Sequence, residues 1–440
     1  MKNTYKVLAG MMLMALLISA CGTATPAATT EPTMAATAAP TAPAGGIDCM
    51  GSMSGDQISV LSEWSGAEGE SLNSILEPFV QACGVQLVTN TTRDLAVLDT
   101  TVKSSPPDVV FWPTTAPVTL YTDQLQNLAN LGVDPANYAD LWIKLGTVNG
   151  SLLAVPVKAD YKSIIWYSPA QFEANGYTIP TTLDELNTLV EKMVTNGQVP
   201  WSMGFESGAA TGWTGSDFIQ DLLLAMKGPD YVNGIIDGSV PYNDPGVLAA
   251  YQQYVKWASD AKYTVGGATG TVNTAFLDGI YKVFSDPPEA MMVKQSGFAG
   301  SEIAKQYPTL KYGTDYDFFA FPGVQGVQGG VDYLMAFGTS PATKALISYL
   351  TGPIGAANWA KANFGLDPNK LAQGQYADPI NAKLADLLAK AQGITPDLGD
   401  TIPAPFGNAE WAAIVAAVQG ADIQPELDKV EAAQMQALGK

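Results

Sequence analysis

Tryptophans and carboxylates lie close together in several stretches of this sequence. The stretch "ESGAATGWTGSDF" places Trp213 among small residues, with Glu206 and Asp217 on either side. A sugar ring presents an apolar face of C–H groups and an edge of hydroxyls, so its binding site needs aromatic side chains and planar hydrogen-bonding groups. Glycine and alanine make a poor core for a tryptophan. Trp213 is therefore either covered by another part of the chain or exposed for a ligand, and we favour the ligand.

The ends of three expected β-strands carry more residues of the same kinds. Trp64 ends the run "ISVLSEW", and Trp112 ends "DVVFW". Arg93, the only arginine of the chain, and Asp94 follow "VQLVTN". Ligands of open α/β sheets bind beyond the carboxyl ends of the strands, so these residues are candidates for ligand contacts. Two structural alternatives stay open: the tryptophans can instead cap the hydrophobic layer, and the arginine can simply pair with Asp94 at the surface.

Composition narrows the classes of function. Lys and Arg together number 22 against 42 Asp and Glu, a formal net charge of -20, which argues against nucleic acid as a partner because phosphates need a basic surface. The chain contains no histidine, which excludes His-based catalysis and His-ligated metal sites, and no cofactor is expected. The G-x-S-x-G, P-loop and H-E-x-x-H motifs are absent. Paired carboxylates suffice for a glycosidase, however, so an exported lipoprotein glycoside hydrolase remains an alternative.

The N-terminus predicts export and lipid anchoring. Two lysines precede the apolar run "VLAGMMLMALLISA", which is too short for a convincing membrane-spanning helix and fits a signal peptide over residues 1–20. The run leads into "ISAC", which resembles a bacterial lipobox with Cys21 as the lipidated residue. Residues 21–48 are rich in Ala, Thr and Pro, as is typical of an extended tether. The alternative is an ordinary signal peptide with a chance cysteine, but we favour a protein anchored to the outer face of the cytoplasmic membrane.

Strand-like runs alternate with helical patterns over much of the chain. One expected helical face has the i, i+3, i+4, i+7 spacing and is formed by Leu72, Ile75, Leu76 and Phe79. Thr182 and Glu185 predict a capping box for a helix that ends near Val194. The alternation is typical of an α/β protein with largely parallel sheets, and a length of 440 residues favours two lobes.

Two cysteines, Cys49 and Cys83, remain beyond the lipobox. In an exported chain, two cysteines are candidates for a disulfide. Cys49 lies upstream of one expected strand, and Cys83 lies just before the next. A bridge is geometrically reasonable if these strands are neighbours, and two buried free thiols are the alternative.

The order of several stretches resembles the extracellular solute-binding proteins of bacterial ABC importers, the family that includes the maltodextrin-binding proteins. These stretches include "SEWSGAEGESLNSILEPF", "SPPDVVFWP", "PWSMGFESGAATGWTGSDFIQD", "GGVDYLMAF" and "APFGNAEWAAIVAAV". They span nearly all of residues 58–420, and within the family the α-glucoside-binding subgroup is the most similar. The resemblance implies a non-enzymatic protein that captures a neutral sugar, an α-glucoside or a short oligosaccharide, and delivers it to an ABC permease.

The same resemblance implies a two-lobed α/β periplasmic-binding-protein fold, with a multi-segment hinge and a ligand cleft between the lobes. Lobe 1 is expected to comprise residues 49–158 plus 326–374, and lobe 2 residues 159–325 plus 375–440. Closure of the lobes around the ligand is the implied mechanism, and the permease is expected to recognise the closed form. We expect the protein to act as a monomer.

Family ligand positions carry over onto matching residues of this chain. Together with the strand-end residues, they give the predicted set Trp64, Glu68, Arg93, Asp94, Trp112, Asp160, Lys162, Trp213, Asp217, Asp332, Phe406 and Trp411. The resemblance places Asp160, Lys162 and Asp332 at or near the hinge. For Trp411, a place in the core is the alternative.

Overall fold

The structure is a computed structural model that describes residues 46–440, except for 93, 392 and 403–404. The predicted signal peptide, Cys21, most of the tether and Arg93 therefore lie outside the described residues. Over the part of the chain that is described, no helix is long and apolar enough to cross a membrane.

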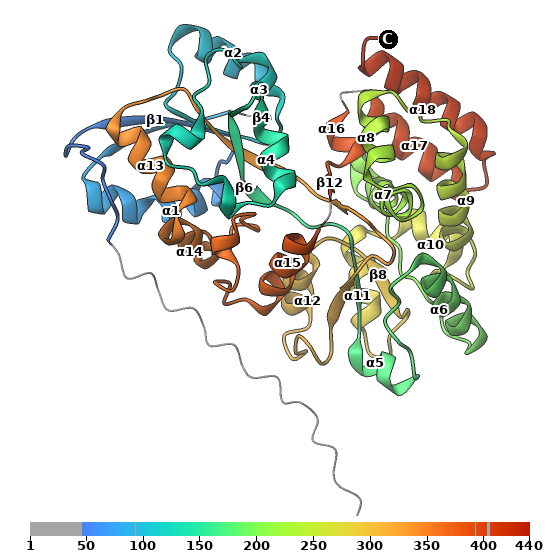
Figure 1. Ribbon diagram of the computed structural model, residues 1–440. Helices are drawn as coiled ribbons and strands as arrows, with labels where there is room; N and C mark the ends of the chain where they lie inside the picture. The colour runs from blue at the N-terminus through green and yellow to red at the C-terminus, as the bar shows by residue number, and fades with distance from the viewer. Residues whose placement is uncertain (1–45, 93, 392, 403–404) are drawn as a thin grey trace, which may run out of the picture. The chain divides into compact units, whose positions relative to one another are not determined.

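The first lobe is built on a five-stranded sheet in the order β2-β1-β3-β11-β6 (Figure 1). Its strands are β1 (Gln57–Ser62), β2 (Gln86–Thr91), β3 (Val109–Trp112), β6 (Ala154–Ala159) and β11 (Val331–Ala336). The strand β1 is parallel to β2 and β3, whereas β11 is antiparallel to β3 and β6. The sheet is therefore mixed. Its antiparallel strand, β11, comes from a distant part of the chain.

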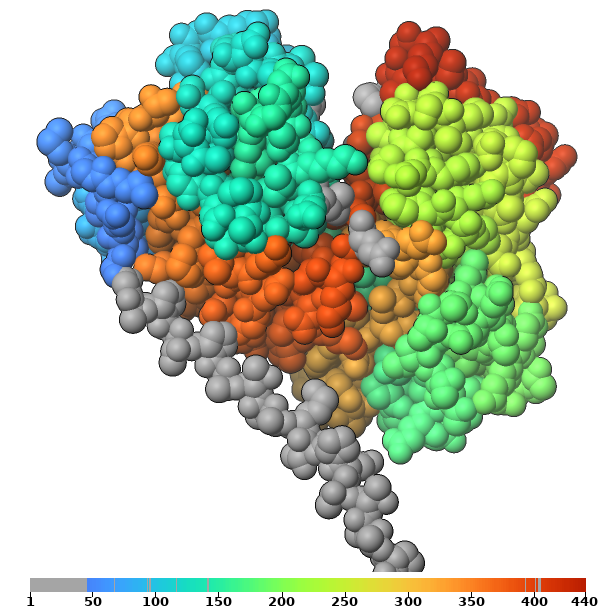
Figure 2. All heavy atoms as spheres, viewed as in Figure 1, coloured from blue at the N-terminus to red at the C-terminus, as the bar shows by residue number. Residues whose placement is uncertain are grey.

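The helices of the first lobe come from two separate parts of the described chain. In α1 (Ala67–Cys83) the predicted face is buried, with each of its four apolar residues at most 3% exposed. Against it pack α13 (Pro341–Thr351), which contacts β1, and α14 (Pro353–Ala362), which contacts α1. Figure 2 shows this arrangement as blue and orange surfaces side by side. The lobe also contains α2 (Leu95–Ser104), α3 (Ala116–Leu120), η1 (Leu128–Leu131), η2 (Pro135–Asn137), α4 (Asp140–Gly146), β4 (Thr147–Val148), β5 (Ser151–Leu152) and η4 (Lys370–Ala372), where η marks a 3-10 helix.

A disulfide ties the start of the first lobe to the end of α1. It joins Cys49 to Cys83, whose Cα atoms are 5.5 Å apart. The backbone pairs at the same place, since the Gly55 N–H donates to the Gly84 carbonyl at 2.9 Å. The strands β1 and β2, which follow these two cysteines, are neighbours in the sheet. The sequence predicts a disulfide on this condition.

The second lobe is built on a small sheet in the order β8-β7-β9, with both pairings antiparallel. Its strands are β7 (Ile164–Tyr167), β8 (Met292–Lys294) and β9 (Asp317–Ala320). The expectation of largely parallel sheets is wrong for this lobe and holds for only part of the first. Alternating strands and helices predict parallel neighbours only when successive strands belong to one sheet, and here the chain changes lobe between strands.

Helices make up most of the second lobe. The predicted capping box is confirmed at the start of α6 (Leu183–Thr195), where the Glu185 N–H donates to the Thr182 hydroxyl at 3.2 Å. The other elements are α5 (Pro169–Ala174), η3 (Gly208–Ala210), α7 (Trp213–Lys227), α8 (Pro229–Asp237), α9 (Pro245–Ser259), α10 (Gly267–Asn273), α11 (Phe276–Phe284), α12 (Ala299–Gln306), α15 (Pro379–Lys390), α16 (Leu398–Thr401), α17 (Phe406–Val418) and α18 (Ile423–Ala437). A separate aromatic core, which includes the fully buried Trp201 and Trp257, fills much of this lobe.

Two segments that connect the sheets are called the hinge here. Residues 160–163 lead from β6 to β7, and residues 321–330 lead from β9 back to β11. The second segment contains β10 (Val327–Gln328), which pairs in parallel with β12 (Ile394–Thr395). The hinge therefore consists of two connecting segments, the second of which contains a short strand paired with β12.

The two hinge segments are joined to each other by their backbones. The Asp160 N–H donates to the Gly330 carbonyl at 3.0 Å, and the Lys162 N–H donates to the Gln328 carbonyl at 2.9 Å. A Cβ atom on Gly329 would lie 2.1 Å from the Asp160 carbonyl oxygen. Only glycine therefore permits this close approach of the two segments.

Candidate ligand-binding site

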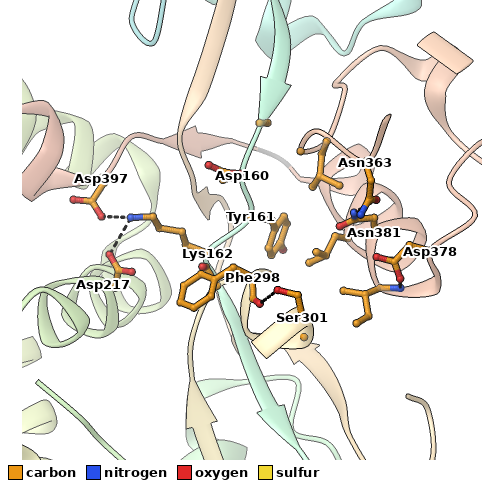
Figure 3. A pocket seen from close by; sticks show the side chains of 18 of the residues that line it. Asp160, Tyr161, Lys162, Asp217, Phe298, Ser301, Asn363, Asp378, Asn381 and Asp397 are labelled. Atoms are coloured by element: carbon orange, nitrogen blue, oxygen red, sulfur yellow. Dashed lines mark hydrogen bonds and ion pairs between the residues drawn. The ribbon is translucent and has the colours of Figure 1, made fainter. Parts of the chain in front are cut away.

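A pocket of about 840 Å³ lies beside the hinge (Figure 3). This volume is usual for sites that hold small molecules. The first hinge segment, the start of α7, parts of α12 and α15, and residues 363–366 after α14 contribute to its walls. Its charged and amide side chains are Asp160, Lys162, Asp217, Asn363, Asp378, Asn381 and Asp397, and its aromatic side chains are Tyr161, Trp213, Phe298, Tyr316 and Trp411.

Trp213 is the first residue of α7 and lies half-buried in the pocket wall. Its ring meets Phe276 edge to face, with centroids 5.5 Å apart. The preceding Gly212 has φ 110°, and a Cβ atom there would lie 2.8 Å from the Trp411 carbonyl oxygen. Glycine therefore lets the start of α7 approach α17, which brings both tryptophans to one pocket.

The pocket contains further aromatic rings that the sequence did not predict. Phe298, just before α12, is 40% exposed, an unusual exposure for a phenylalanine in a folded chain. Tyr161 belongs to the first hinge segment, and Tyr316 lies just before β9. Apolar rings on several sides of one cavity suit a ligand with apolar faces.

Planar polar groups face the same cavity (Figure 3). Asp160 is exposed on the first hinge segment. Asp378 caps α15 by accepting a hydrogen bond from the Ile380 N–H at 3.1 Å. The Asn381 side-chain Nδ2 donates to the side-chain Oδ1 of Asn363 at 2.5 Å. Such carboxylates and amides accept and donate hydrogen bonds in fixed planes, as sugar hydroxyls require.

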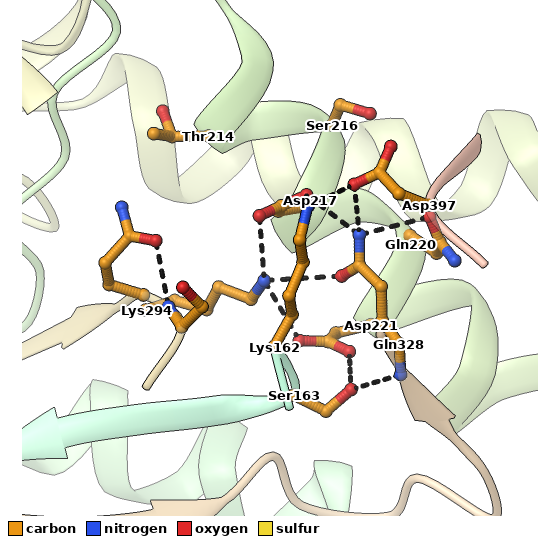
Figure 4. A network of polar contacts seen from close by, with 12 residues as sticks. Lys162, Ser163, Thr214, Ser216, Asp217, Gln220, Asp221, Lys294, Gln328 and Asp397 are labelled. Carbon is orange, nitrogen blue, oxygen red and sulfur yellow. Dashed lines mark hydrogen bonds and ion pairs between the residues drawn. The ribbon is translucent and has the colours of Figure 1, made fainter. Parts of the chain in front are cut away.

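Lys162 links the first hinge segment to the second lobe (Figure 4). Its Nζ donates to Asp397 Oδ2 at 2.8 Å and to Asp217 Oδ1 at 3.4 Å. Asp217 is the fifth residue of α7, and Asp397 lies just before α16. The lysine therefore neutralises part of a cluster of acids that would otherwise repel one another at the pocket wall.

A second lysine lies deeper in the same cluster. Lys294 on β8 is 3.3 Å from Asp221 and 3.9 Å from the second oxygen of Asp217, and all three side chains are buried. Burial raises the pKa of Asp217, although Lys162 and Lys294 oppose this shift. Burial also raises the pKa of Asp221, against the effect of Lys294. The ionisation of both carboxyl groups therefore depends on the ammonium groups of the nearby lysines.

Glu410 is buried behind the pocket wall, one residue before Trp411. Its Oε1 accepts a hydrogen bond from the Tyr242 hydroxyl at 2.6 Å, and its Oε2 accepts one from the Ser216 hydroxyl at 2.7 Å. Burial raises the pKa of this carboxyl to about 8, in spite of these two hydrogen bonds. Glu410 therefore stays protonated at neutral pH.

This pKa predicts that the free energy of unfolding falls as the pH rises from about 5 to about 8.5. The ordinary pKa of a glutamate is 4.5, so in this window the unfolded chain has released the proton that the folded chain still holds. Raising the pH then favours the unfolded state. Glu410→Gln should flatten the dependence, whereas Glu77→Gln, at an exposed position of α1, should not. Melting temperatures across this pH range provide the measurement, and parallel curves for wild type and Glu410→Gln would refute the assignment.

Three predicted ligand residues lie in the hydrophobic cores instead. Trp64 is 1% exposed, Trp112 is 4% exposed and Phe406 is fully buried. The Trp64 ring packs against Phe111 at 5.1 Å and Phe364 at 5.1 Å, which cover the end of β1. Trp112 on β3 pairs with Tyr333 of β11, a strand that comes from far along the chain, and Phe406 packs in the second lobe. For the two tryptophans the structure favours the alternative of a core position, because distant segments fill the space beyond the strand ends. The expectation that Phe406 faces the ligand is not met either, since its ring is buried in the second lobe.

Other predicted residues lie near the hinge or on the surface. Asp332 accepts a hydrogen bond from Lys158 Nζ at 3.1 Å, and Glu68 is 4.0 Å from the same nitrogen. Asp94 is exposed and caps α2 by accepting from the Ala96 N–H at 2.8 Å. Glu206 is exposed and does not line the pocket. The predicted residues that do line the pocket are Asp160, Lys162, Trp213, Asp217 and Trp411.

Several pocket residues had no clear signal in the sequence. Asp378 and Asp397 each precede a helix, a position that cap preferences for aspartate already explain, and Phe298 is one apolar residue before α12. Asn363 has φ 56°, and such a left-handed asparagine at a helix end is explained by the turn alone. Only the three-dimensional arrangement shows that these residues face one cavity.

The family profile described as bacterial extracellular solute-binding protein matches residues 75–383. The chain belongs to this family. Its members are solute receptors and not enzymes.

The osmoprotective compounds-binding protein GgtB of Synechocystis sp. is 28% identical over 390 residues, which cover 85% of this chain and 91% of that protein. The alpha-glucosides-binding periplasmic protein AglE of Rhizobium meliloti is 31% identical over 395 residues, which cover 84% of each protein.

Solved structures of other solute-binding proteins share the fold. The bacterial solute receptor AcbH, described with an exclusive preference for β-D-galactopyranose, aligns with a TM-score of 0.72 at 19% identity. The alignment covers 89% of this chain and 100% of that chain. This likeness establishes the two-lobed α/β fold, as the sequence resemblance predicted.

Proposed function

We propose that this solute-binding protein captures a neutral sugar, an α-glucoside or a short oligosaccharide, and delivers it to an ABC permease. The observation that carries the proposal is the presence of Trp213 and Trp411 in one pocket with carboxylates and amides. Aromatic rings complement the faces of a sugar, and planar polar groups complement its hydroxyls. The similarity to AglE, named for binding alpha-glucosides, supports this class of ligand.

The proposed mechanism is closure of the lobes around the sugar. Asp160 and Lys162 belong to both the hinge and the pocket wall, so a ligand that contacts them also affects the segment about which the lobes move. A ligand shifts a conformational equilibrium only through its different affinity for the two states. Ring stacking and hydroxyl hydrogen bonds supply this difference, and the permease recognises the closed form. One chain provides the pocket, so a monomer suffices.

Thermal-shift measurements on the purified protein test this proposal. Maltose, trehalose and sucrose serve as neutral α-glucosides, with galactose and raffinose as further sugars and glutamate as a non-sugar control. A ligand at a hundred times its Kd stabilises the native state by about 2.7 kcal/mol, so a bound sugar should clearly raise Tm. The same Tm with every saccharide, confirmed by calorimetric titration, would reject sugar capture.

The alternative of an exported glycoside hydrolase finds no support in the family. The paired carboxylates of the pocket, Asp217 and Asp397, share a lysine rather than flanking an open gap. The bound sugar should therefore be recovered intact after a long incubation. Steady release of a cleaved product, lost in Asp217→Asn, would instead identify a hydrolase.

We further propose that Cys21 is acylated and tethers the protein to the outer face of the membrane. The supporting observation is the lipobox-like "ISAC" followed by an Ala/Thr/Pro-rich segment. In cells fed an alkyne-tagged fatty acid, the wild type should be labelled and should fractionate with membranes. Cys21→Ala should be unlabelled and should remain a longer precursor. Equal labelling and processing of both proteins would exclude the anchor.

A further inference from the structure

Gln328 is a fully buried glutamine on the hinge strand β10. Its side-chain Nε2 donates to Asp217 Oδ1 at 2.8 Å and to Asp397 Oδ2 at 2.9 Å (Figure 4). Lys162 Nζ contacts the same two oxygens, at 3.4 Å and 2.8 Å. The two pocket carboxylates are therefore bridged twice, once by an ammonium group and once by a neutral amide.

Further hydrogen bonds fix the orientation of this amide. Its Oε1 accepts from Lys294 Nζ at 3.4 Å, and its Nε2 also lies 3.2 Å from the side-chain oxygen of Gln220. The backbone N–H of Gln328 donates to the Ser163 hydroxyl at 2.8 Å. Its carbonyl accepts from the Lys162 N–H at 2.9 Å. The residue is thus held from the first hinge segment, from β8 and from α7.

A neutral amide matches the charges that surround this position. The charged groups facing it are the carboxylates of Asp217, Asp221 and Asp397 and the ammonium groups of Lys162 and Lys294. The N–H side of the amide faces carboxylates, and its oxygen faces an ammonium group. A carboxylate in its place would lose both donors, and an ammonium group would lose the acceptor. Among side chains of this length, glutamine supplies both without taking up a proton.

We propose that Gln328 is a positioning residue of the binding site, which holds Asp217 and Asp397 at the spacing that the ligand meets and ties that spacing to the hinge. The inference rests on the proposed function, because it assumes that these pocket carboxylates contact the captured sugar. Gln328 itself is fully buried and does not line the pocket. It acts on the ligand only through the two aspartates.

The connection to the hinge follows from the backbone of β10. Gln328 pairs with Thr395 of β12, two residues before Asp397, and with Lys162 of the other hinge segment. A movement of β10 therefore shifts the amide relative to Asp217 on α7, and it also reaches β12, two residues before Asp397. Gln328 therefore belongs to the hinge and also supports two carboxylates of the pocket wall.

Affinity measurements on matched variants test the role. Gln328→Met keeps the length of the side chain but removes both donors. We expect its affinity for maltose, or for whichever of trehalose and sucrose the wild type binds, to fall about tenfold or more, as is typical when hydrogen bonds to charged groups are lost. Gln434→Met is the control: Gln434 is equally buried, donates to the Ile235 carbonyl at 2.6 Å and lies outside the pocket. It should lower Tm without a change in sugar affinity.

A pH profile separates positioning from a merely structural role. Gln328→Glu places a third carboxylate beside Asp217 and Asp397, so binding should be lost at about pH 8. At about pH 5.5 the new side chain can be protonated and donate a hydrogen bond again, so much of the affinity should return. A structural role alone would lower Tm but leave the shape of the affinity profile like that of the wild type.

A titration without ligand keeps this test separate from the test of sugar capture. Carboxyl ¹³C NMR of the ligand-free protein, with Asp217→Asn for assignment, reports the ionisation of Asp217. Loss of the donor in Gln328→Met should raise its titration midpoint. If the wild type binds no sugar, the proposed function fails, and the titration still decides whether the amide holds Asp217. Wild-type affinity, where binding occurs, or an unchanged Asp217 midpoint in Gln328→Met would overturn the proposal.

Discussion

Replacing Trp64 by alanine should lower the free energy of unfolding by about 3–5 kcal/mol, the loss typical of a large aromatic removed from a core. The Trp64 side chain is 1% exposed. It packs against Phe111 at 5.1 Å, Trp359 at 6.1 Å and Phe364 at 5.1 Å. These neighbours come from β3, α14 and the segment after α14, so the cavity would be lined by separate elements that cannot all collapse into it.

Urea unfolding of the wild type, Trp64→Ala and Trp64→Phe provides the measurement. The phenylalanine variant retains much of the aromatic contact and should lose less stability than the alanine variant. At temperatures where Trp64→Ala remains folded, its sugar affinity should fall much less than that of Trp213→Ala, because Trp64 packs behind residues 363–366 of the wall and does not itself line the pocket. An alanine variant with wild-type stability but weakened binding would instead show that Trp64 contacts the ligand.

The sequence predicted local structure well where neighbouring residues determine it. The buried face of α1 and the capping box of α6 depend on side chains within two turns of one another, and both are found in the structure. The alternation of strands and helices could not show strand direction in the sheets. That direction depends on β11 and β9 returning from far along the chain, which no local pattern contains.

The strand-end tryptophans show a limit of the rule that ligands bind beyond the carboxyl ends of strands. Trp64 and Trp112 lie near such ends, but elements more than two hundred residues further along the chain cover them: Phe364 packs on Trp64, and Tyr333 pairs with Trp112. The ring of Trp213 is not covered in this way, because it lies at the start of α7, directly after Gly212. The composition of the surrounding loop distinguished it from the other two, whereas strand position did not.

The polar part of the site was predictable only in pieces. Lys162 and Asp217 matched family positions, but Asp397 lies 235 residues from Lys162 in the sequence and contacts it at 2.8 Å. In the sequence alone, Gln328 is simply a polar residue within a glycine-rich segment of the hinge. A buried network of this kind is set by tertiary contacts, since its members have no fixed spacing along the chain.

Trp213→Ala should weaken sugar binding by about thirtyfold or more, equivalent to ~2 kcal/mol for a central aromatic contact. The ring is half-buried at the start of α7 and lines the pocket. Its contact with Phe276 is made edge to face, with the ring centroids 5.5 Å apart. If a sugar stacks on this ring, the alanine variant loses a surface that is fully desolvated only in the complex. Trp213→Phe keeps a smaller ring and should recover part of the affinity.

The ligand-free melting temperature distinguishes this role from a structural one. Because Trp213 is only half-buried, Trp213→Ala should cost the ligand-free protein much less stability than Trp64→Ala, the matched core variant. Calorimetric titration and melting curves on the same preparations give both quantities. The two tryptophans should therefore show opposite patterns, with lost binding for one and lost stability for the other. A Trp213→Ala protein that melts as early as Trp64→Ala yet binds its sugar normally would show that this ring supports the second lobe and does not contact the ligand.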